Sequence, residues 1–157
     1  MTSISTEIEI NAPPAVVRKH FLNFENHANW NPFFVKVAVY KKKEANAVDI
    51  QPGDQLHIDI KPKGKSPMAI YPTVNVNTEE EFSWTGTLIF AWLFSGTHKF
   101  EFVPETVAGV VKTKLLHSET FGGILVPLLG WLGLFKNTEI SFKEVNEALK
   151  SQVEELE

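Results

Sequence analysis

The sequence predicts an α+β fold in which a curved antiparallel sheet of about six to seven strands wraps around one long C-terminal helix. From Phe34 to Phe121 the chain consists of short stretches in which apolar and polar residues alternate, as in strands with one buried face. From Phe142 onward the apolar residues instead follow helical spacing. Turn dipeptides such as Pro52-Gly53 and Ala108-Gly109 separate several of the stretches, which favours antiparallel neighbours.

The N-terminal part predicts one strand followed by two short helices. Residues 3–12 alternate, with Ile4, Ile8 and Ile10 on the apolar side. Two prolines then stand where a helix can begin, and residues 25–33 predict a second helical turn that ends before Pro32. His27 lies in this turn, and we expect its side chain to be exposed.

Alternation also assigns side chains to the inner face of the later strands. Residues 80–90, 96–104 and 109–121 predict three strands in which the lysines and Glu101 face outward. The inward set comprises Phe82, Trp84, Gly86, Leu88, Phe90, His98, Phe100, Phe102, Leu115, His117, Glu119 and Phe121. Two histidines and a glutamate therefore share the apolar side of the sheet.

The second and third of these strands are joined by a short segment, which predicts that they pair as a hairpin. Two registers suit the turn, one with His98 opposite Leu115 and one with His98 opposite His117; in the second, Phe100 lies opposite Leu115 and Gly96 opposite Glu119. Opposed side chains are roughly 5 Å apart at Cβ. The second register would bring His98, His117 and Glu119 together at one end of an apolar cavity.

The C-terminal region predicts one long helix, whose apolar face includes Val145, Leu149 and Val153. It is the only expected element large enough to cover the sheet. The apolar run 124–135 that precedes it contains Pro127 and two glycines, so we expect a bent lead-in. This run is too short to span a membrane, which takes roughly 20 residues. Membrane contact through Trp131 is an alternative that we do not favour, because a peripheral anchor usually adds a basic face.

Composition restricts the class of protein. The 157 residues fit a single domain over 1–157 with a sizeable core. A net charge of -4 and a pI of about 5.8 argue against a nucleic-acid partner. The absence of cysteine excludes disulfides, thiolate metal sites and a cysteine nucleophile. Because the N-terminus also lacks a signal pattern, we expect a cytoplasmic protein.

The stretch TEIEINAPPAVVRKHFLNFENHANWNPF, residues 6–33, resembles the first strand and helix pair of the START-like superfamily (SRPBCC). That superfamily includes the polyketide cyclase/dehydrase and lipid-transport proteins. The segments PGDQLHI, FSWTG, SGTHKFEF and LLHSETFGGIL follow in the order typical of its members, so the resemblance covers nearly the whole chain. It implies a helix-grip fold with an internal hydrophobic cavity, and it would place Trp30 and Phe33 near the cavity mouth. Its members include carriers, receptors and cyclases, so the fold alone does not select a function.

We therefore expect a hydrophobic ligand, a lipid or a polyketide-like molecule. The expected lining residues are Trp30, Phe33, Trp84, Gly86, Leu88, Phe100, Phe102, Leu115 and Phe121. These aromatic side chains either line an open cavity or fill it, and the sequence leaves both possibilities open. No metal or other cofactor is expected, because no P-loop, dinucleotide fingerprint or H-E-x-x-H spacing is present. Oligomeric state is not readable from the sequence.

An earlier strand, predicted over residues 54–62, also has an apolar face. Alternation places Leu56, Ile58 and Ile60 on that face, with His57 and Asp59 on the opposite one. No contact with the ligand is assigned to position 58. We expect this residue to pack in the core.

Three roles are open for His98, His117 and Glu119. In a carrier they would hydrogen-bond a hydroxyl or carboxylate of the ligand. In a cofactor-independent cyclase, dehydratase or isomerase they would be catalytic, taking a proton next to a carbonyl and returning it elsewhere. In the third interpretation they only satisfy one another's hydrogen bonds, as buried polar groups must.

Overall fold

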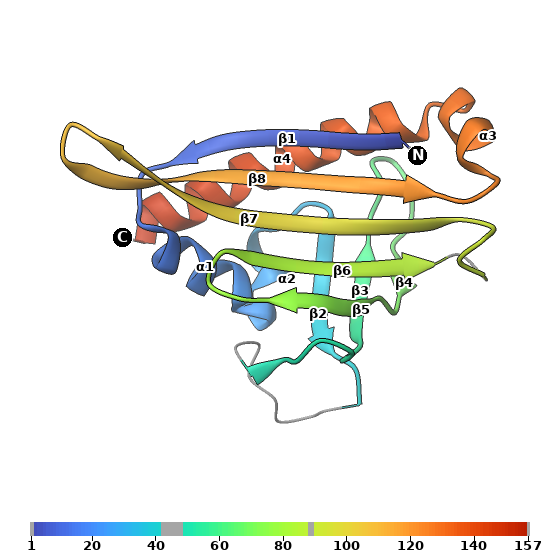
Figure 1. The fold of residues 1–157 in the computed structure, drawn as a ribbon, viewed down its shortest axis with the longest axis horizontal. Helices are drawn as coiled ribbons and strands as arrows, with labels where there is room; N and C mark the ends of the chain where they lie inside the picture. The colour runs from blue at the N-terminus through green and yellow to red at the C-terminus, as the bar shows by residue number, and fades with distance from the viewer. Residues whose placement is uncertain (1, 42–48, 88–89, 157) are drawn as a thin grey trace.

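The computed structural model describes residues 2–41, 49–87 and 90–156. Strand β1 and three short helical segments open the chain, and a series of strands follows before a short and a long helix close it (Figure 1). In chain order the elements are β1 (Thr2–Ile10), α1 (Pro14–Leu22), η1 (Phe24–Asn26), α2 (His27–Trp30), β2 (Phe34–Val39), β3 (Leu56–Ile60), β4 (Met68–Ile70), β5 (Thr73–Asn77), β6 (Glu81–Thr87), β7 (Ser95–Val107), β8 (Val110–Gly122), α3 (Val126–Trp131) and α4 (Leu134–Leu156).

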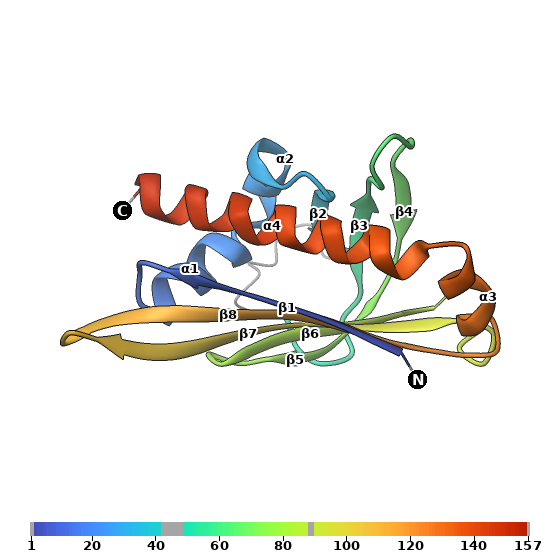
Figure 2. The same cartoon turned by 90° about the horizontal axis from the view of Figure 1, so that it is seen from above.

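The strands form two antiparallel sheets. The larger sheet has five strands in the order β1-β8-β7-β6-β5, and the smaller has the order β2-β3-β4. Figure 2 shows α4 lying across one face of the larger sheet, with the smaller sheet standing up from the larger one on the same side as α4. This arrangement confirms the predicted α+β helix-grip fold, in which one long helix covers a curved antiparallel sheet.

The strand count differs from the prediction of about six to seven strands in one sheet. The described residues form eight strands, because residues 68–77 divide into β4 and β5 at Tyr71 and Pro72. Proline has no N–H to donate to a strand ladder. Its carbonyl accepts a hydrogen bond from the Leu56 N–H at 2.9 Å, so the chain passes from the smaller sheet to the larger one at this point.

Helix α4 buries the face that its sequence predicts. Phe142, Val145, Leu149 and Val153 are all fully buried. The lead-in is bent as expected, since α3 and α4 are separate helices with Gly133 between them at a φ of 83°. Among the residues that the structure describes, no helix is both long and apolar enough to cross a bilayer.

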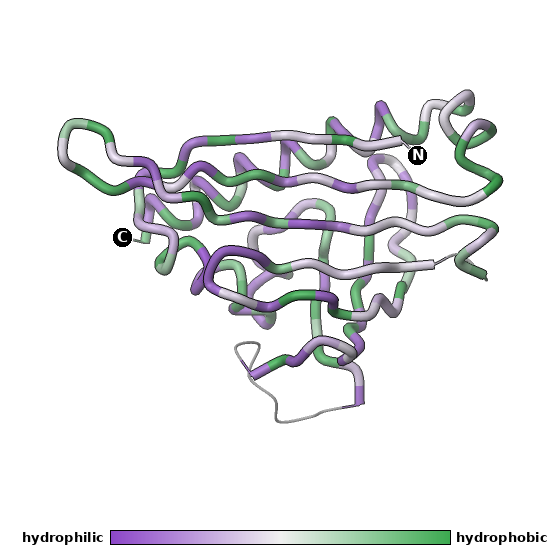
Figure 3. Tube along the Cα trace, viewed as in Figure 1, coloured by the Kyte–Doolittle hydropathy of each residue, from purple (hydrophilic) through white to green (hydrophobic). Residues whose placement is uncertain are grey.

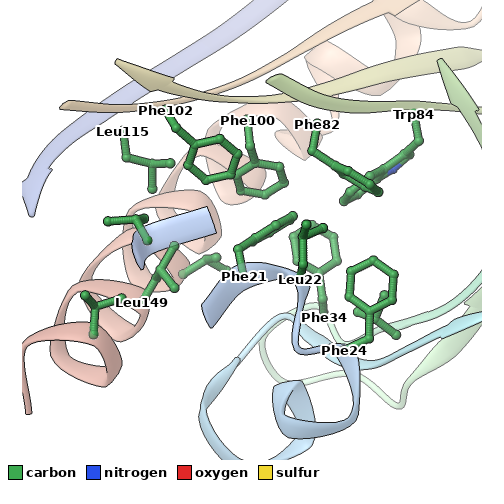
Figure 4. Close-up of a cluster of buried hydrophobic side chains, with 14 of the residues drawn as sticks. Phe21, Leu22, Phe24, Phe34, Phe82, Trp84, Phe100, Phe102, Leu115 and Leu149 are labelled. Atoms are coloured by element: carbon green, nitrogen blue, oxygen red, sulfur yellow. The ribbon is translucent and has the colours of Figure 1, made fainter. Parts of the chain in front are cut away.

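Aromatic side chains fill the space between the sheet and the helices. Phe82, Phe100 and Phe102 project from the sheet toward Phe21 of α1 (Figure 4). The ring centroid of Phe21 lies 4.4 Å from that of Phe100, 5.7 Å from Phe82 and 5.9 Å from Phe102. All four side chains are almost completely inaccessible to solvent. The sequence left open whether the aromatic side chains line an open cavity or fill it. In this part of the interior they fill it.

This packing predicts a large loss of stability when a core phenylalanine is truncated. We expect Phe100→Ala to lower the free energy of unfolding by about 3–5 kcal/mol, because the buried ring is removed and its neighbours close the gap only in part. Urea unfolding followed by circular dichroism would measure the change. The matched control is Phe90→Ala, at an exposed phenylalanine, where the change is expected to stay within about 0.5 kcal/mol. Equal effects at the two positions would contradict the assignment of Phe100 to a packed core.

Candidate functional site

The site begins with the register of the hairpin formed by β7 and β8. His98 pairs with Glu119, Phe100 with His117 and Phe102 with Leu115, two residues away from the second of the two expected registers. The expected turn was too long. Both strands run to a two-residue turn at Ala108 and Gly109, whose φ values of 51° and 79° suit a type I′ turn.

The inner face of this hairpin nevertheless brings the two predicted histidines into contact. His98 and His117 lie on neighbouring strands, diagonal to each other, and their Nε2 atoms are 2.6 Å apart. Both side chains are buried. A bond between two ring nitrogens needs one protonated and one unprotonated atom, so the two rings must hold complementary tautomers.

Two residues outside the hairpin determine which tautomers these are. The hydroxyl of Thr6, on β1, donates to the carbonyl oxygen of His117 at 2.9 Å, so its oxygen accepts from Asn146 Nδ2 at 2.9 Å. The Oδ1 atom of Asn146, on α4, therefore faces His117 Nδ1 at 2.7 Å, and Nδ1 donates to it. His117 Nε2 is then the acceptor, and His98 donates from its own Nε2.

The remaining ring nitrogen of His98, Nδ1, is unprotonated and lies 3.5 Å from Glu119 Oε2. The polar side chains thus form one continuous series from Glu119 through His98, His117 and Asn146 to Thr6, which we call the polar chain. Every donor along it points away from Glu119. A proton on the Glu119 carboxyl would therefore face an acceptor, His98 Nδ1.

Burial decides the charge states of this chain. Burial lowers the pKa of His98 to about 3. Burial, and then the neighbouring His98, lower the pKa of His117 well below its usual 6.5. Burial also raises the pKa of Glu119 to about 8. Between these values all three groups are neutral, so the contact between His98 and Glu119 joins two uncharged groups at neutral pH.

Aromatic rings hold both histidines and exclude water from them. His117 is stacked between Phe100, at a centroid distance of 4.2 Å, and Phe142, at 4.1 Å. His98 stacks on Trp84 at 4.7 Å. The low pKa values of the histidines follow from this apolar packing, because a charged imidazole would lose its hydration without gaining a counter-charge.

Glu119, at one end of the polar chain, is more accessible than its neighbour His98, since 17% of its side chain is exposed against 3% for His98. Space for its carboxyl comes from Gly96 on β7. A Cβ atom at Gly96 would collide with Glu119 Oε1, so no other residue fits beside the carboxyl in this conformation.

The residues predicted to line the cavity separate into two buried groups. Trp84, Phe100, Phe102 and Leu115 belong to the large core between the sheet and the helices. Phe121, with Ile4 and Phe142, forms a small second cluster. Phe33 packs against both of these groups.

Three further residues were predicted to line the cavity, namely Trp30, Gly86 and Leu88. Trp30 packs on the large core beside His27, and its Nε1 is buried without a hydrogen-bond partner among the described residues. Gly86 pairs with Gly96, and a Cβ there would meet only Pro72 at an ordinary 3.9 Å. Leu88 lies outside the described residues.

Ile58, to which no ligand contact was assigned, takes no part in the candidate site. Ile58 lies in the middle strand of the smaller sheet, where it pairs with Val37 on β2 and with Ile70 on β4. Its side chain is fully buried in the large core. The residue therefore stabilises the contact between the smaller sheet and the rest of the interior.

A hollow of about 510 Å³ opens at the surface beside the second cluster. It is lined by Thr2, Gly122, Gly123, Val126, Pro127, Gly130 and Phe135. Phe135 belongs to the second cluster as a partly buried member, and its ring lies 4.6 Å from that of Phe121. The hollow therefore lies beside the second cluster, with Phe135 between it and Phe121, and Glu119 does not line it.

The expected exposure of His27 was wrong. The side chain is buried, because both ring nitrogens find partners inside the protein. Nε2 donates to the Phe21 carbonyl oxygen at 2.6 Å, and Nδ1 accepts from Asn31 Nδ2 at 3.2 Å. Burial lowers the pKa of His27 to about 4.

The sequence analysis missed two members of the polar chain, Asn146 and Thr6. Both positions could be recognised in the sequence. Asn146 interrupts the apolar face of the long helix next to Val145, and Thr6 lies on the same side of the predicted first strand as Ile4 and Ile8. Among the described residues, no three His, Asp or Glu side chains are arranged to hold a metal ion.

Comparison with known proteins places this arrangement in a family. The model of the family described as polyketide cyclase / dehydrase and lipid transport matches residues 1–154. The chain belongs to this family. A comparison with curated proteins gave no match.

Solved structures share the fold of the family at low sequence identity. A START superfamily protein from Mycobacterium smegmatis is 17% identical, with a TM-score of 0.73 over 99% of both chains. The Zhui aromatase/cyclase from Streptomyces sp. R1128 is 11% identical, with a TM-score of 0.71 over 98% of this chain and 93% of that one. The protein TTHA0849 from Thermus thermophilus is 15% identical, with a TM-score of 0.72 over 99% of both chains. At these identities the likeness shows the fold alone.

Cutting the polar chain at α4 should destabilise the protein. Asn146→Leu removes the side-chain acceptor of the His117 Nδ1–H and leaves only the backbone hydrogen bond to Phe142, so the cost should lie at the lower end of the roughly 1–3 kcal/mol of a buried unsatisfied group. Urea unfolding measures the loss, and long-range ¹⁵N–¹H NMR of the imidazoles shows whether His117 leaves the Nδ1–H tautomer. Asn137→Leu, at an exposed position on the same helix, is the matched control and should change neither quantity. A wild-type His117 found in the Nε2–H tautomer would contradict the direction of the chain.

The pKa of Glu119 predicts a pH dependence of stability with a defined sign. The folded protein keeps the Glu119 proton up to about pH 8, whereas an unfolded glutamate releases it near 4.5. Unfolding in this window therefore releases a proton, and stability falls as the pH rises from 4.5 toward 8, by up to about 1.4 kcal/mol per pH unit. The Glu119→Gln side chain cannot ionise, so the stability of this variant should not show the decrease that Glu119 causes between pH 4.5 and 8. Parallel stability–pH curves of the two proteins would contradict a raised pKa.

Proposed function

We propose that this protein binds a hydrophobic small molecule, a lipid or a polyketide-like compound, at the α3 end of its interior, with Glu119 as the polar group that meets the ligand. The observation that carries this proposal is a carboxyl that burial keeps neutral, in apolar surroundings, on the accessible side of the polar chain. Its proton faces His98 Nδ1, so the other carboxyl oxygen can accept a hydrogen bond from a hydroxyl of an otherwise apolar ligand.

The packing supports the α3 end as the place of binding. The large core is closed by interlocking aromatic rings, so a ligand there would have to displace fully buried side chains. The second cluster has three buried members, and four side chains that are only partly buried pack against it, namely Phe33, Phe94, Val126 and Phe135. Movement of Phe135 and Phe121 would extend the surface hollow toward Glu119. The ligand would then contact Phe33 and Phe121, with Trp84, Phe100, Phe102 and Leu115 forming the packed wall behind it.

His98 and His117 are positioning residues in this proposal. They lie behind Glu119 in the polar chain, and their low pKa values keep them neutral over the physiological range. Their unprotonated acceptor, His98 Nδ1, orients the carboxyl proton and leaves the other carboxyl oxygen for the ligand.

The same geometry supports a second function, a cofactor-independent cyclase, dehydratase or isomerase. A general acid–base works best when its pKa is close to the working pH, and burial brings Glu119 to about 8. Ionised Glu119 can take a proton from a carbon next to a carbonyl. The neutral carboxyl can then return that proton to a hydroxyl that leaves as water, which restores the carboxylate and consumes no cofactor.

Binding can be tested with N-phenyl-1-naphthylamine, a neutral hydrophobic fluorophore. We expect saturable fluorescence with the wild-type protein and a rise in Kd of at least about tenfold for Val126→Trp, because the larger side chain fills the hollow. Val110→Trp, at an exposed valine on the β7–β8 turn, is the control and should bind as the wild type does. Equal affinities of the two variants, or no binding at all, would refute the proposed place of binding.

Glu119→Gln separates the carrier from the enzyme. A carrier keeps probe binding and has no turnover to lose. An enzyme presented with a polyketide-like β-ketone loses turnover in this variant while probe binding is retained. A wild-type protein that binds the probe and converts no member of a panel of such ketones excludes the second function for that panel.

A further inference from the structure

An exposed apolar surface projects from the α3 end of the molecule. It is formed by residues 90–94, between β6 and β7, and residues 124–132, which include α3, and we call it the lip. The Ile124 N–H donates to the Trp92 carbonyl oxygen at 3.1 Å, and the Leu125 N–H to that of Leu93 at 3.1 Å. Figure 1 shows both segments at the same end of the sheet, and the hydrophobic colour runs through both in Figure 3.

The lip exposes an unusual amount of apolar surface for its size. Trp131 is 82% exposed and Trp92 62% exposed, the two highest values among the four tryptophans. The exposed large side chains of the lip are Phe90, Trp92, Ile124, Leu128, Trp131 and Leu132. Phe90 was expected on the inner face, but β6 ends at Thr87 and the ring instead stacks beside Trp92, at a centroid distance of 6.0 Å. Contiguous exposed patches of this kind mark interaction sites.

The charge pattern restricts what can cover the lip. Residues 82–98 and 120–135 contain no Asp, Glu, Lys or Arg, and the nearest charge along α4 is Lys136 at its border. Protein interfaces usually have a polar rim around an apolar centre. An anionic membrane would be repelled by a protein of net charge -4 that offers one lysine here. The interfacial region of a zwitterionic bilayer fits both the missing charges and the tryptophans, which prefer that depth.

We propose that the lip inserts into the surface of a zwitterionic lipid bilayer, with Trp92 and Trp131 at the level of the headgroups. The contact is peripheral, since α3 covers only Val126–Trp131. The missing basic face, which argued against membrane contact in the sequence, is not required at a zwitterionic surface, where apolar burial drives insertion. The ammonium group of Lys136 remains in the headgroup region while its stem lies along the apolar surface.

Insertion would also bring the mouth of the hollow to the bilayer. Val126, Pro127 and Gly130 belong both to the lip and to the wall of the hollow. A hydrophobic ligand would then pass from the membrane toward Phe121 and Glu119 without crossing water. This consequence rests on the proposed function, whereas insertion of the lip does not, because the ligand-free protein presents the same surface.

Co-sedimentation with pure phosphatidylcholine vesicles tests the proposal. We expect the wild-type protein to bind, with little change when the salt concentration is raised. The double variant Trp92→Ser/Trp131→Ser should lose at least about tenfold in partitioning, because two large exposed rings no longer leave water on binding. Val107→Ser/Val110→Ser is the matched control, since it removes exposed apolar side chains at the other end of the β7–β8 hairpin, and it should bind as the wild type does.

A second readout does not depend on variants. Phosphatidylcholine brominated near the headgroup quenches inserted tryptophans, so we expect quenching of the emission from Trp92 and Trp131 while the more buried Trp30 and Trp84 are spared. Failure of the wild type to sediment, binding that requires phosphatidylserine and disappears in salt, or a wild-type dimer that the double variant dissociates would each overturn the proposal. Vesicle binding without N-phenyl-1-naphthylamine binding would leave the lip intact and refute the ligand site alone.

Discussion

The hydrogen bonds of the polar chain are the constraint on which the rest of this structure depends. They join β1, β7, β8 and α4 through Thr6, His98, His117 and Asn146 inside an otherwise apolar interior, and Glu119 lies 3.5 Å from His98 at the end of the series. Each buried polar group costs free energy unless its partner is in place, so the chain stabilises only one placement of the helix on the sheet. Apolar packing alone would tolerate a small rotation or shift of α4, because apolar contacts are not directional.

The chain also divides the interior into two parts with different properties. On one side lies the large core, in which phenylalanine rings interlock and leave the helix and sheet rigidly packed. On the other side lie Glu119, the second cluster and the hollow, where several side chains are only partly buried. Rigid packing holds the histidines in place, and the looser end leaves room for a ligand. The polyketide cyclase/dehydrase and lipid transport family includes both chemistry and transport, and a neutral buried carboxyl is compatible with either.

Alternation in the sequence predicted part of this site. It placed His98, His117 and Glu119 on one inner face, and their convergence is confirmed even though the register was wrong by two residues. The register depends on turn geometry: Ala108-Gly109 was recognised as a turn dipeptide, but its length of two residues was not, because Ala108 adopts a positive φ that is uncommon for a residue other than glycine. The filling of the interior could not be predicted either, since it depends on sheet curvature and on how far Phe21 reaches toward Phe100.

The lip shows a different limit of prediction from the sequence. The alternation of residues along the strand assigned Phe90 to the inner face because the strand was extended to residue 90. This alternation applies only within a strand, and Phe90 lies outside β6. By contrast, Asn146 and Thr6 could have been found, because a polar residue within an apolar periodic face always needs a partner. The tautomers could not be read from the sequence at all, since they follow from one threonine hydroxyl that donates to the backbone of His117.

The most direct test of this account is infrared difference spectroscopy of the carboxyl groups in the folded protein. At neutral pH we predict a C=O stretching band of a protonated carboxylic acid, absent from Glu119→Gln and lost as the pH is raised through about 8. That result would show that the polar chain ends in a neutral, proton-donating carboxyl. A spectrum with only ionised carboxylates at neutral pH would contradict the account, because Glu119 would then be charged and the direction of the hydrogen bonds through His98 and His117 would have to be reversed.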